Sequence, residues 1–251
     1  MAKKKNANRE LLLVGENASF QFNEAYKSLR TNLEFLAATS DCKSILVTSS
    51  IPTEGKTNVA VNLAYTMAAA GKKVILLDCD LRKGMLGHYL HMRHNTPGLS
   101  SKVSGAADWK DICYSIPRVD NLTVIPNGPL PPNPSELLSS SQMESLFEDL
   151  KSHCDILIVD TPPVSLVTDA AILSRYVDGV LLVVRPDVTT IQGAQLSKKN
   201  LEAVDAHILG VVINGYDTKK NSKKDGYYYS YNYYSYYGDD SSDSKKKGLI
   251  Q

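Results

Sequence analysis

Nine residues decide how this chain folds, Ser49-Ser50-Ile51-Pro52-Thr53-Glu54-Gly55-Lys56-Thr57. They follow the apolar run 44–47 and precede a helical pattern, which is the context of a phosphate-binding loop. Backbone N–H groups in such a loop converge on phosphate oxygens, and the N-terminus of the helix adds a positive dipole. We therefore expect a bound nucleoside triphosphate, with Lys56 on its β- and γ-phosphates and the Thr57 hydroxyl on Mg²⁺.

The loop departs from the strict pattern G-x-x-x-x-G-K-[ST] at its first position, which is Ser50. The alternative is a helix N-terminus that carries Gly-Lys-Thr by chance. The strand before it, the helix after it and two acid-ended strands downstream argue against chance. We expect Lys56 to be a surface-loop residue whose loss spares the fold. The predicted nucleotide contacts are Glu54, Gly55, Lys56, Thr57 and Asn58.

Two later apolar runs end in acidic residues. The run 73–77 leads to Asp78-Cys79-Asp80, and the run 156–159 leads to Asp160. Because the carboxyl ends of parallel strands face the ligand crevice, these acids should lie near the phosphate loop. Asp160 has the Walker B form, whose acid holds Mg²⁺ directly or through water. Asp78 and Asp80 can both reach a metal–phosphate cluster, although a solvated turn is the alternative for that pair taken alone.

Apolar runs alternate with amphipathic segments along most of the chain. This alternation predicts an α/β fold of the P-loop NTPase type, with a mostly parallel central sheet and helices on both faces. A short strand is expected within 11–14 and an irregular stretch over 83–118. Expected strands cover 44–47, 73–77, 122–125, 155–160, 179–185 and 208–214, and expected helices cover 22–35, 59–70, 141–152 and 191–204. Ser141 and Glu144 predict a capping box, after a proline-rich loop at 128–134.

Composition narrows the possible partners. Lys and Arg number 28 against 27 Asp and Glu, so bulk charge indicates no nucleic-acid partner. The four cysteines show no C-x-x-C spacing, which argues against a zinc site or a disulfide framework and fits a reducing cytoplasm. No signal peptide and no apolar run long enough to span a membrane are recognised, so membrane association is expected only through a partner.

The chain divides into an N-terminal arm (1–20), a P-loop domain (21–215) and a tail (216–251). The tail is polar and charged with no periodic apolar face, so we expect it to be disordered. It concentrates eight of the chain's 14 tyrosines in eleven residues. These are Tyr227, Tyr228, Tyr229, Tyr231, Tyr233, Tyr234, Tyr236 and Tyr237.

Together these features resemble the bacterial tyrosine kinases of capsular and exopolysaccharide systems, the BY-kinase family of the CpsD/CapB type. The resemblance covers nearly the whole chain. It rests on the phosphate loop, on Ile-Leu-Leu-Asp-Cys-Asp-Leu-Arg (75–82), on Ile-Leu-Ile-Val-Asp-Thr-Pro-Pro (156–163) and on the tyrosine cluster. It implies an ATP- and Mg²⁺-dependent kinase domain over 21–215 that autophosphorylates the tail tyrosines.

The resemblance also implies residue roles. Lys56, Asp78 and Asp80 would be catalytic, with Thr57, Asp78, Asp80 and Asp160 around Mg²⁺. Asn214 would lie by the adenine.

The family's oligomer motif, Glu-x-x-Arg-x-x-Arg, is matched by Glu24, Lys27 and Arg30, with Lys in place of the first Arg. Lysine keeps the charge and loses the planar fork, so a ring interface is implied in weakened form. Taken without the resemblance, this charged stripe reads as a solvated helix face.

The partners implied are a membrane adaptor of the polysaccharide co-polymerase type, further copies of the chain and a cognate phosphotyrosine phosphatase. The adaptor would recruit a cytoplasmic protein to the inner face of the cell membrane. The expected reaction is phosphoryl transfer between subunits, from ATP to tail tyrosines. Two alternatives stay open, a ParA/MinD-like ATPase switch and a nucleotide-binding scaffold. The first would carry a signature lysine where this chain has Ile51.

Overall fold

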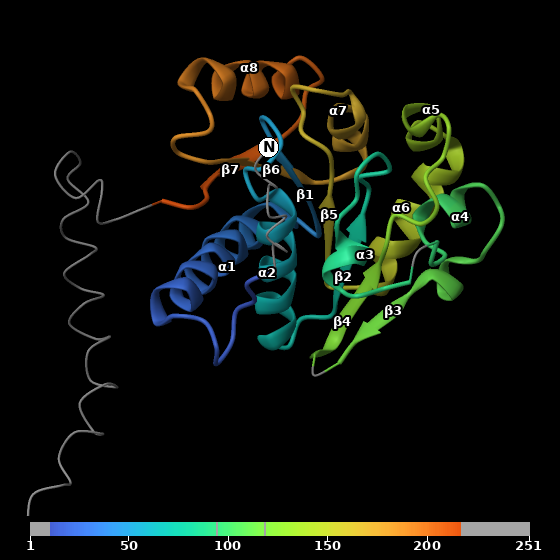
Figure 1. Ribbon diagram of the computed structural model, residues 1–251, viewed down its shortest axis with the longest axis horizontal. Helices are drawn as coiled ribbons and strands as arrows, with labels where there is room; N and C mark the ends of the chain where they lie inside the picture. The colour runs from blue at the N-terminus through green and yellow to red at the C-terminus, as the bar shows by residue number, and fades with distance from the viewer. Residues whose placement is uncertain (1–10, 94, 118, 217–251) are drawn as a thin grey trace, which may run out of the picture.

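The computed structural model describes residues 11–93, 95–117 and 119–216 (Figure 1). Its centre is a seven-stranded sheet in the order β3-β4-β2-β5-β1-β6-β7. Neighbouring strands are parallel except for β3, which pairs antiparallel with β4. The strands are β1 (Ser44–Ser49), β2 (Val74–Asp78), β3 (Tyr114–Ile116), β4 (Val119–Ile125), β5 (Ile156–Asp160), β6 (Gly179–Val184) and β7 (Ile208–Ile213). The predicted mostly parallel sheet is confirmed.

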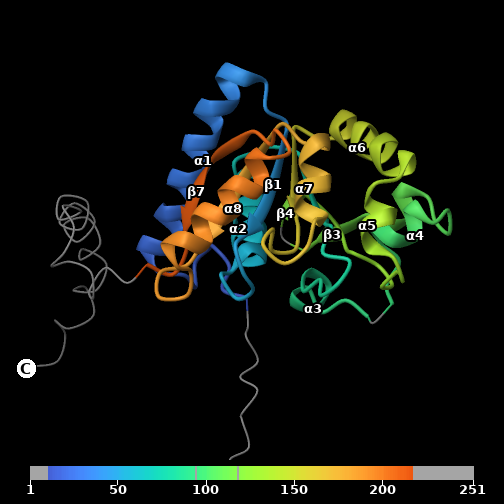
Figure 2. The same cartoon turned by 90° about the horizontal axis from the view of Figure 1, so that it is seen from above.

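Helices cover both faces of this sheet, as predicted. α1 and α2 pack on one face, and α4 to α8 contribute to the apolar layer on the other. Both views place α4, α5 and α6 together at the end of the molecule opposite α1 (Figure 1, Figure 2). The helices are α1 (Phe20–Ser40), α2 (Lys56–Ala69), α3 (Leu86–Tyr89), α4 (Leu99–Val103), α5 (Pro134–Leu138), α6 (Ser141–His153), α7 (Asp169–Leu173) and α8 (Ile191–Glu202).

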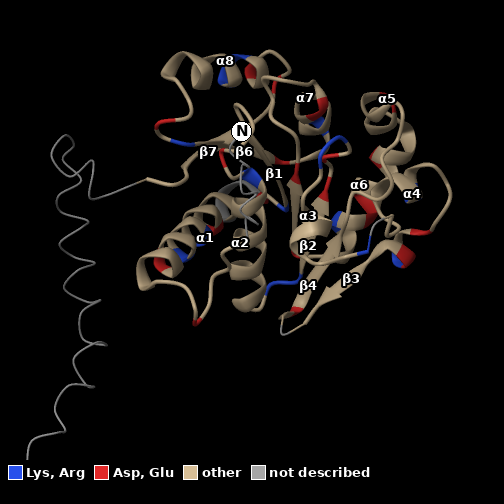
Figure 3. Cartoon of the chain, in the orientation of Figure 1, with Lys and Arg blue, Asp and Glu red and all other residues tan. Residues whose placement is uncertain are grey.

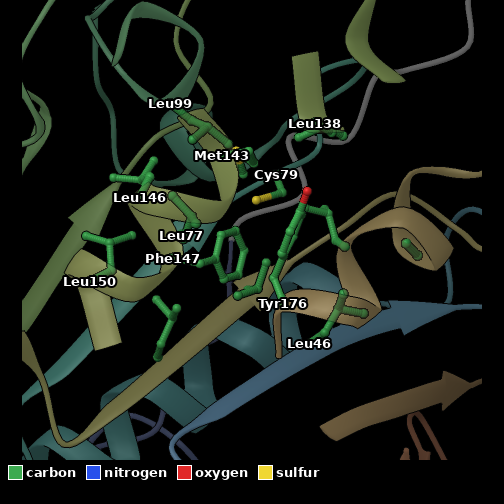
Figure 4. Close-up of a cluster of buried hydrophobic side chains, with 14 of the residues drawn as sticks. Leu46, Leu77, Cys79, Leu99, Leu138, Met143, Leu146, Phe147, Leu150 and Tyr176 are labelled. Atoms are coloured by element: carbon green, nitrogen blue, oxygen red, sulfur yellow. The ribbon is translucent and has the colours of Figure 1, made fainter. Parts of the chain in front are cut away.

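The central strands are buried over their whole length because both of their faces are covered. Every residue of β1, β2 and β5 is buried. Figure 4 shows one of the two apolar layers, in which Phe147 of α6 lies beside Tyr176, and Leu46 of β1 belongs to the same layer. The Phe147 and Tyr176 ring centroids are 5.4 Å apart. This packing gives the strand ends, where the acids lie, a rigid base.

The predicted strand within 11–14 is absent. Instead, Asn62 of α2 holds this segment: its Oδ1 accepts from the Val14 N–H (2.7 Å) and its Nδ2 donates to the Leu12 carbonyl (2.9 Å). The buried Asn62 amide therefore makes the hydrogen bonds to this backbone segment that a neighbouring strand would otherwise have made.

The region between β2 and α6 also differs from expectation. β3 and the short helices α3 to α5 are present in stretches expected to be irregular or loop. Pro134 begins α5, where its missing N–H costs no hydrogen bond. α6 starts at Ser141 as predicted, but its N-cap is Ser140, whose side chain makes no capping bond. The predicted capping box of Ser141 with Glu144 is therefore wrong.

The tail tyrosines from Tyr227 to Tyr237 and the first half of the predicted arm lie outside the described residues. Along the described part of the chain, no helix combines the length and the apolar character needed to cross a bilayer.

Candidate active site

The phosphate loop lies between β1 and α2, in the predicted strand–loop–helix setting. Gly55 is the N-cap of α2 and has φ 89°, in the left-handed region that favours glycine. A Cβ at this position would lie 2.1 Å from Nδ2 of Asn214, which follows β7. Both the backbone conformation and the available space therefore favour glycine here, because a methyl group would displace the Asn214 side chain.

Glu54 braces the loop from within the protein. The residue is buried, and its Oε2 accepts from the Ile51 N–H at 2.7 Å. Its other carboxylate oxygen accepts from the Thr189 hydroxyl in the loop after β6. Burial raises the pKa of the Glu54 carboxyl, and backbone donors including Ile51 oppose that rise. The Glu54 carboxylate thus links the phosphate loop to the loop that follows β6.

The two predicted nucleotide contacts that are asparagines also have side chains with partners in the protein. Asn214 Nδ2 donates to the Glu54 carbonyl at 2.7 Å, which fastens the end of β7 to the phosphate loop. Asn58 Oδ1 accepts from the Tyr26 hydroxyl of α1 at 3.2 Å, so the Asn58 side chain is turned toward that helix. Of the two, Asn214 is the one in direct contact with the loop.

The predicted acids and Lys56 meet at the carboxyl ends of the strands. β2 and β5 are adjacent, with Asp78 paired in register to Asp160. Lys56 Nζ lies 3.1 Å from Asp80 Oδ2 and 3.4 Å from Asp160 Oδ1. Thr57 Oγ1 donates to Asp160 Oδ2 at 2.6 Å. Figure 3 shows acidic segments at the ends of the central strands, beside a basic segment where α2 begins.

Burial and the neighbouring charges shift the pKa values of the acids and of Lys56. Burial raises the pKa of Asp78 well above its usual range, and the Asp160 charge adds to the rise. Burial also raises the pKa of Asp160, against the opposing effects of Lys56 and Thr57. Burial alone would lower the pKa of Lys56, but the charges of Asp160, Asp80 and Asp78 outweigh it, so that the pKa rises. The cluster therefore favours bound positive charge.

The donor set fits Mg²⁺, which takes one or two carboxylates together with substrate phosphates. Asp78 Oδ2 is buried and has no hydrogen-bond partner, while Oδ1 accepts from the Asp80 N–H at 3.0 Å. No group of three or more His, Cys, Asp or Glu side chains in the described ranges forms a ready-made metal site. Phosphate and water oxygens would complete the coordination of a cation at this position.

Sequence reasoning missed several residues around the cluster. Gly84 packs so closely that a Cβ there would lie 2.7 Å from Asp78 Oδ2 and 2.8 Å from Asn127. Arg82 forms an ion pair with Asp169, 87 positions away in the chain. Arg82 is the last residue of the motif 75–82, so the sequence does point to it. No sequence pattern points to its partner, Asp169.

Replacing Gly55 with alanine should weaken ATP binding by at least roughly tenfold, because the added methyl group displaces Asn214 and distorts the N-terminal amides of α2. The matched control is Gly71→Ala, since Gly71 also has a positive φ (91°) but nothing lies within 4 Å of a Cβ there. Both variants incur the left-handed backbone penalty of about 1–2 kcal/mol. Titration with a fluorescent ATP analogue compares them, and equal affinities would contradict the prediction.

The chain is similar to known proteins along most of its length. The sequence model of the family described as AAA domain matches residues 43–209. Putative tyrosine-protein kinase CapB of Staphylococcus aureus is 36% identical, over 92% of this chain and 99% of its own length. Tyrosine-protein kinase YwqD of Bacillus subtilis is 37% identical, over 88% of this chain and 91% of its own. Among solved structures, the kinase domain of Escherichia coli tyrosine kinase ETK superposes with a TM-score of 0.73 at 36% identity, covering 76% of this chain and 74% of that one.

Proposed function

Because this chain belongs to the bacterial tyrosine-protein kinases, we propose that it transfers the γ-phosphoryl group of ATP chiefly to tyrosines of its own tail. The family makes the chain a nucleotide-binding tyrosine kinase, which argues against the ATPase-switch and scaffold alternatives. The observation that carries the proposal is the convergence of Lys56, Thr57 and the three acids at the phosphate loop.

Each residue of the site has a role that its contacts allow. The amides at the start of α2 and the Lys56 ammonium would hold the phosphates and stabilise the charge of the transferring group. Thr57, Asp160 and Asp80 would hold Mg²⁺, with Asp78 in reach. When bound, Mg²⁺ would neutralise part of the negative charge of the phosphates. Asp78 would accept the proton of the tyrosine hydroxyl or orient that hydroxyl. The raised pKa of Asp78 makes its ionised form a stronger base.

Regulation through partners is part of the proposal. We expect a membrane adaptor of the polysaccharide co-polymerase type to recruit and activate the chain at the inner face of the membrane. A cognate phosphotyrosine phosphatase would reset the tail. The process served would be the synthesis and export of capsular polysaccharide or exopolysaccharide. These expectations rest on the family resemblance.

Assembly into an oligomer would use the charged stripe of α1. Lys27 Nζ lies 2.6 Å from Glu24 Oε1, and the Lys27 side chain is 56% exposed. Arg30 is directed inward, because its Nη1 donates to the Thr66 carbonyl of α2 at 3.1 Å. Glu24 and Lys27 are therefore the better placed to meet a neighbouring subunit, and Arg30 also joins α1 to α2.

Phosphorylation should run between subunits. From Tyr216 to Tyr227 is eleven residues, which as a flexible chain spans roughly 18 Å and at full stretch about 40 Å. Its own site and a neighbour's both fall within this reach, so length does not decide. Assembly through α1 would hold a neighbour's tail at an effective concentration on the order of millimolar, which favours transfer between subunits.

The test mixes Lys56→Met chains that carry the tail with active chains truncated after Tyr216. Their different lengths assign the label by size. Phosphotyrosine should appear on the inactive, longer chain, and Lys27→Glu in both chains should reduce it by lowering assembly. If the two chains co-purify and the longer one remains unlabelled, transfer occurs within one subunit.

A further inference from the structure

Arg82, Asp169 and Ser135 form a polar cluster beside the candidate site. Arg82 Nε lies 2.8 Å from Asp169 Oδ2, and Arg82 Nη2 lies 2.9 Å from Asp169 Oδ1. The Ser135 hydroxyl donates to Asp169 Oδ1 at 2.9 Å and accepts from Arg82 Nη2 at 2.7 Å. Asp169 is fully buried. The cluster joins the turn after β2 to α5 and α7, three segments far apart in the chain.

The turn anchored by Arg82 is also the turn that holds Asp80. Asp80 Oδ1 accepts from the Lys83 N–H at 2.9 Å and from the Arg82 N–H at 3.3 Å. The other oxygen of Asp80 lies 3.1 Å from Lys56 Nζ. A displacement of this turn therefore changes the direction of the Asp80 carboxylate and its distance from Lys56.

We propose that Arg82, Asp169 and Ser135 form a clamp that positions Asp80, and through it Lys56, for phosphoryl transfer. The inference rests on the proposed roles of those two residues. Arg82 suits the task because its planar fork meets the buried carboxylate through two parallel bonds, which set the direction of its side chain. The three clamp residues are positioning residues. A different role would be to hold α5 and α7 on the sheet without effect on the chemistry.

Arg82→Lys separates these roles, since lysine keeps the charge and loses the fork. If the clamp positions Asp80, kcat should fall roughly 10- to 100-fold, as expected for a displacement of about 1 Å. The KM for ATP should change less than about threefold, because the loop amides remain. Asp169→Asn should act in the same direction.

A hydroxyl–carboxylate contact at the opposite end of the sheet provides the control. The Ser44 hydroxyl donates to Asp178 Oδ2 at 2.7 Å, at the amino ends of β1 and β6. Ser44→Ala matches Ser135→Ala and Asp178→Asn matches Asp169→Asn, but both lie far from the phosphate loop. They should lower the thermal midpoint and leave kcat within about twofold. Ser135→Ala, the mildest change in the clamp, should still lower kcat severalfold, so the test survives if a stronger variant fails to fold.

A double-mutant cycle identifies the route of the effect. If Arg82 acts through Asp80, Arg82→Lys should have no further effect on kcat in an Asp80→Asn background. Undiminished loss in that background, or an unchanged kcat in folded Arg82→Lys and Ser135→Ala, overturns the clamp. Absence of phosphotyrosine from the wild-type chain with Mg²⁺, ATP and the adaptor segment would instead contradict the proposed function.

Discussion

Replacing Lys56 with methionine should lower tyrosine phosphorylation by at least roughly 10²–10³-fold, the effect typical of losing one group that stabilises transition-state charge. The ammonium lies between Asp80 and Asp160 at the N-terminus of α2, where the phosphates of ATP are expected. Immunoblotting for phosphotyrosine with Mg²⁺, ATP and the adaptor segment measures the loss. Unchanged phosphorylation would remove the assigned role of Lys56.

The same variant should also be less stable without Mg²⁺, which differs from the sequence-based expectation. The Lys56 side chain is only 13% exposed, so it is not a surface-loop residue. Its removal leaves buried acids without their counter-charge, at a cost of up to about 3–5 kcal/mol. Thermal unfolding should show a lowered midpoint that Mg²⁺ partly restores. Lys56→Arg is the matched control, because it keeps the charge and should keep most of the stability.

The sheet was predictable because buried parallel strands appear in the sequence as continuous apolar runs. β2 and β5 each end in an acid at the position where the apolar run stops, so the sequence alone places Asp78 and Asp160 at the same edge of the sheet. No local sequence pattern predicts that β2 and β5 pair. Their proximity was expected only because a P-loop fold must bring its acidic residues to the phosphate loop.

The contacts that hold the site in place were not predictable. Glu54 meets Thr189 across 135 positions and Arg82 meets Asp169 across 87, and single polar residues at such separations leave no periodic pattern. The short elements escaped for a related reason, since β3 has three residues and α7 has five. Such elements are too short to show an apolar repeat.

Asp78→Asn should have opposite effects on catalysis and on stability. Asp78 is fully buried, its Oδ2 has no hydrogen-bond partner, and burial raises its pKa well above the usual range. An ionised carboxylate in that position destabilises the fold, since it has lost its hydration and its Oδ2 has gained no partner in return. A neutral amide of the same shape removes this cost. We therefore expect the nucleotide-free variant to unfold at a higher temperature than wild type.

The turnover of Asp78→Asn should nevertheless fall roughly 10²–10⁴-fold, as expected when a general base is removed, because an amide cannot accept the tyrosine proton. ATP affinity should change little, since the amides of the phosphate loop and Lys56 remain.

Asp80→Asn is the matched control: Asp80 lies 3.1 Å from Lys56 Nζ, so its neutralisation loses an ion pair and should lower the unfolding temperature. Calorimetry, nucleotide titration and kcat distinguish the two variants. Equal losses of affinity and turnover in Asp78→Asn would mean that Asp78 serves binding, and a lowered unfolding temperature would mean that its carboxylate is paired in solution.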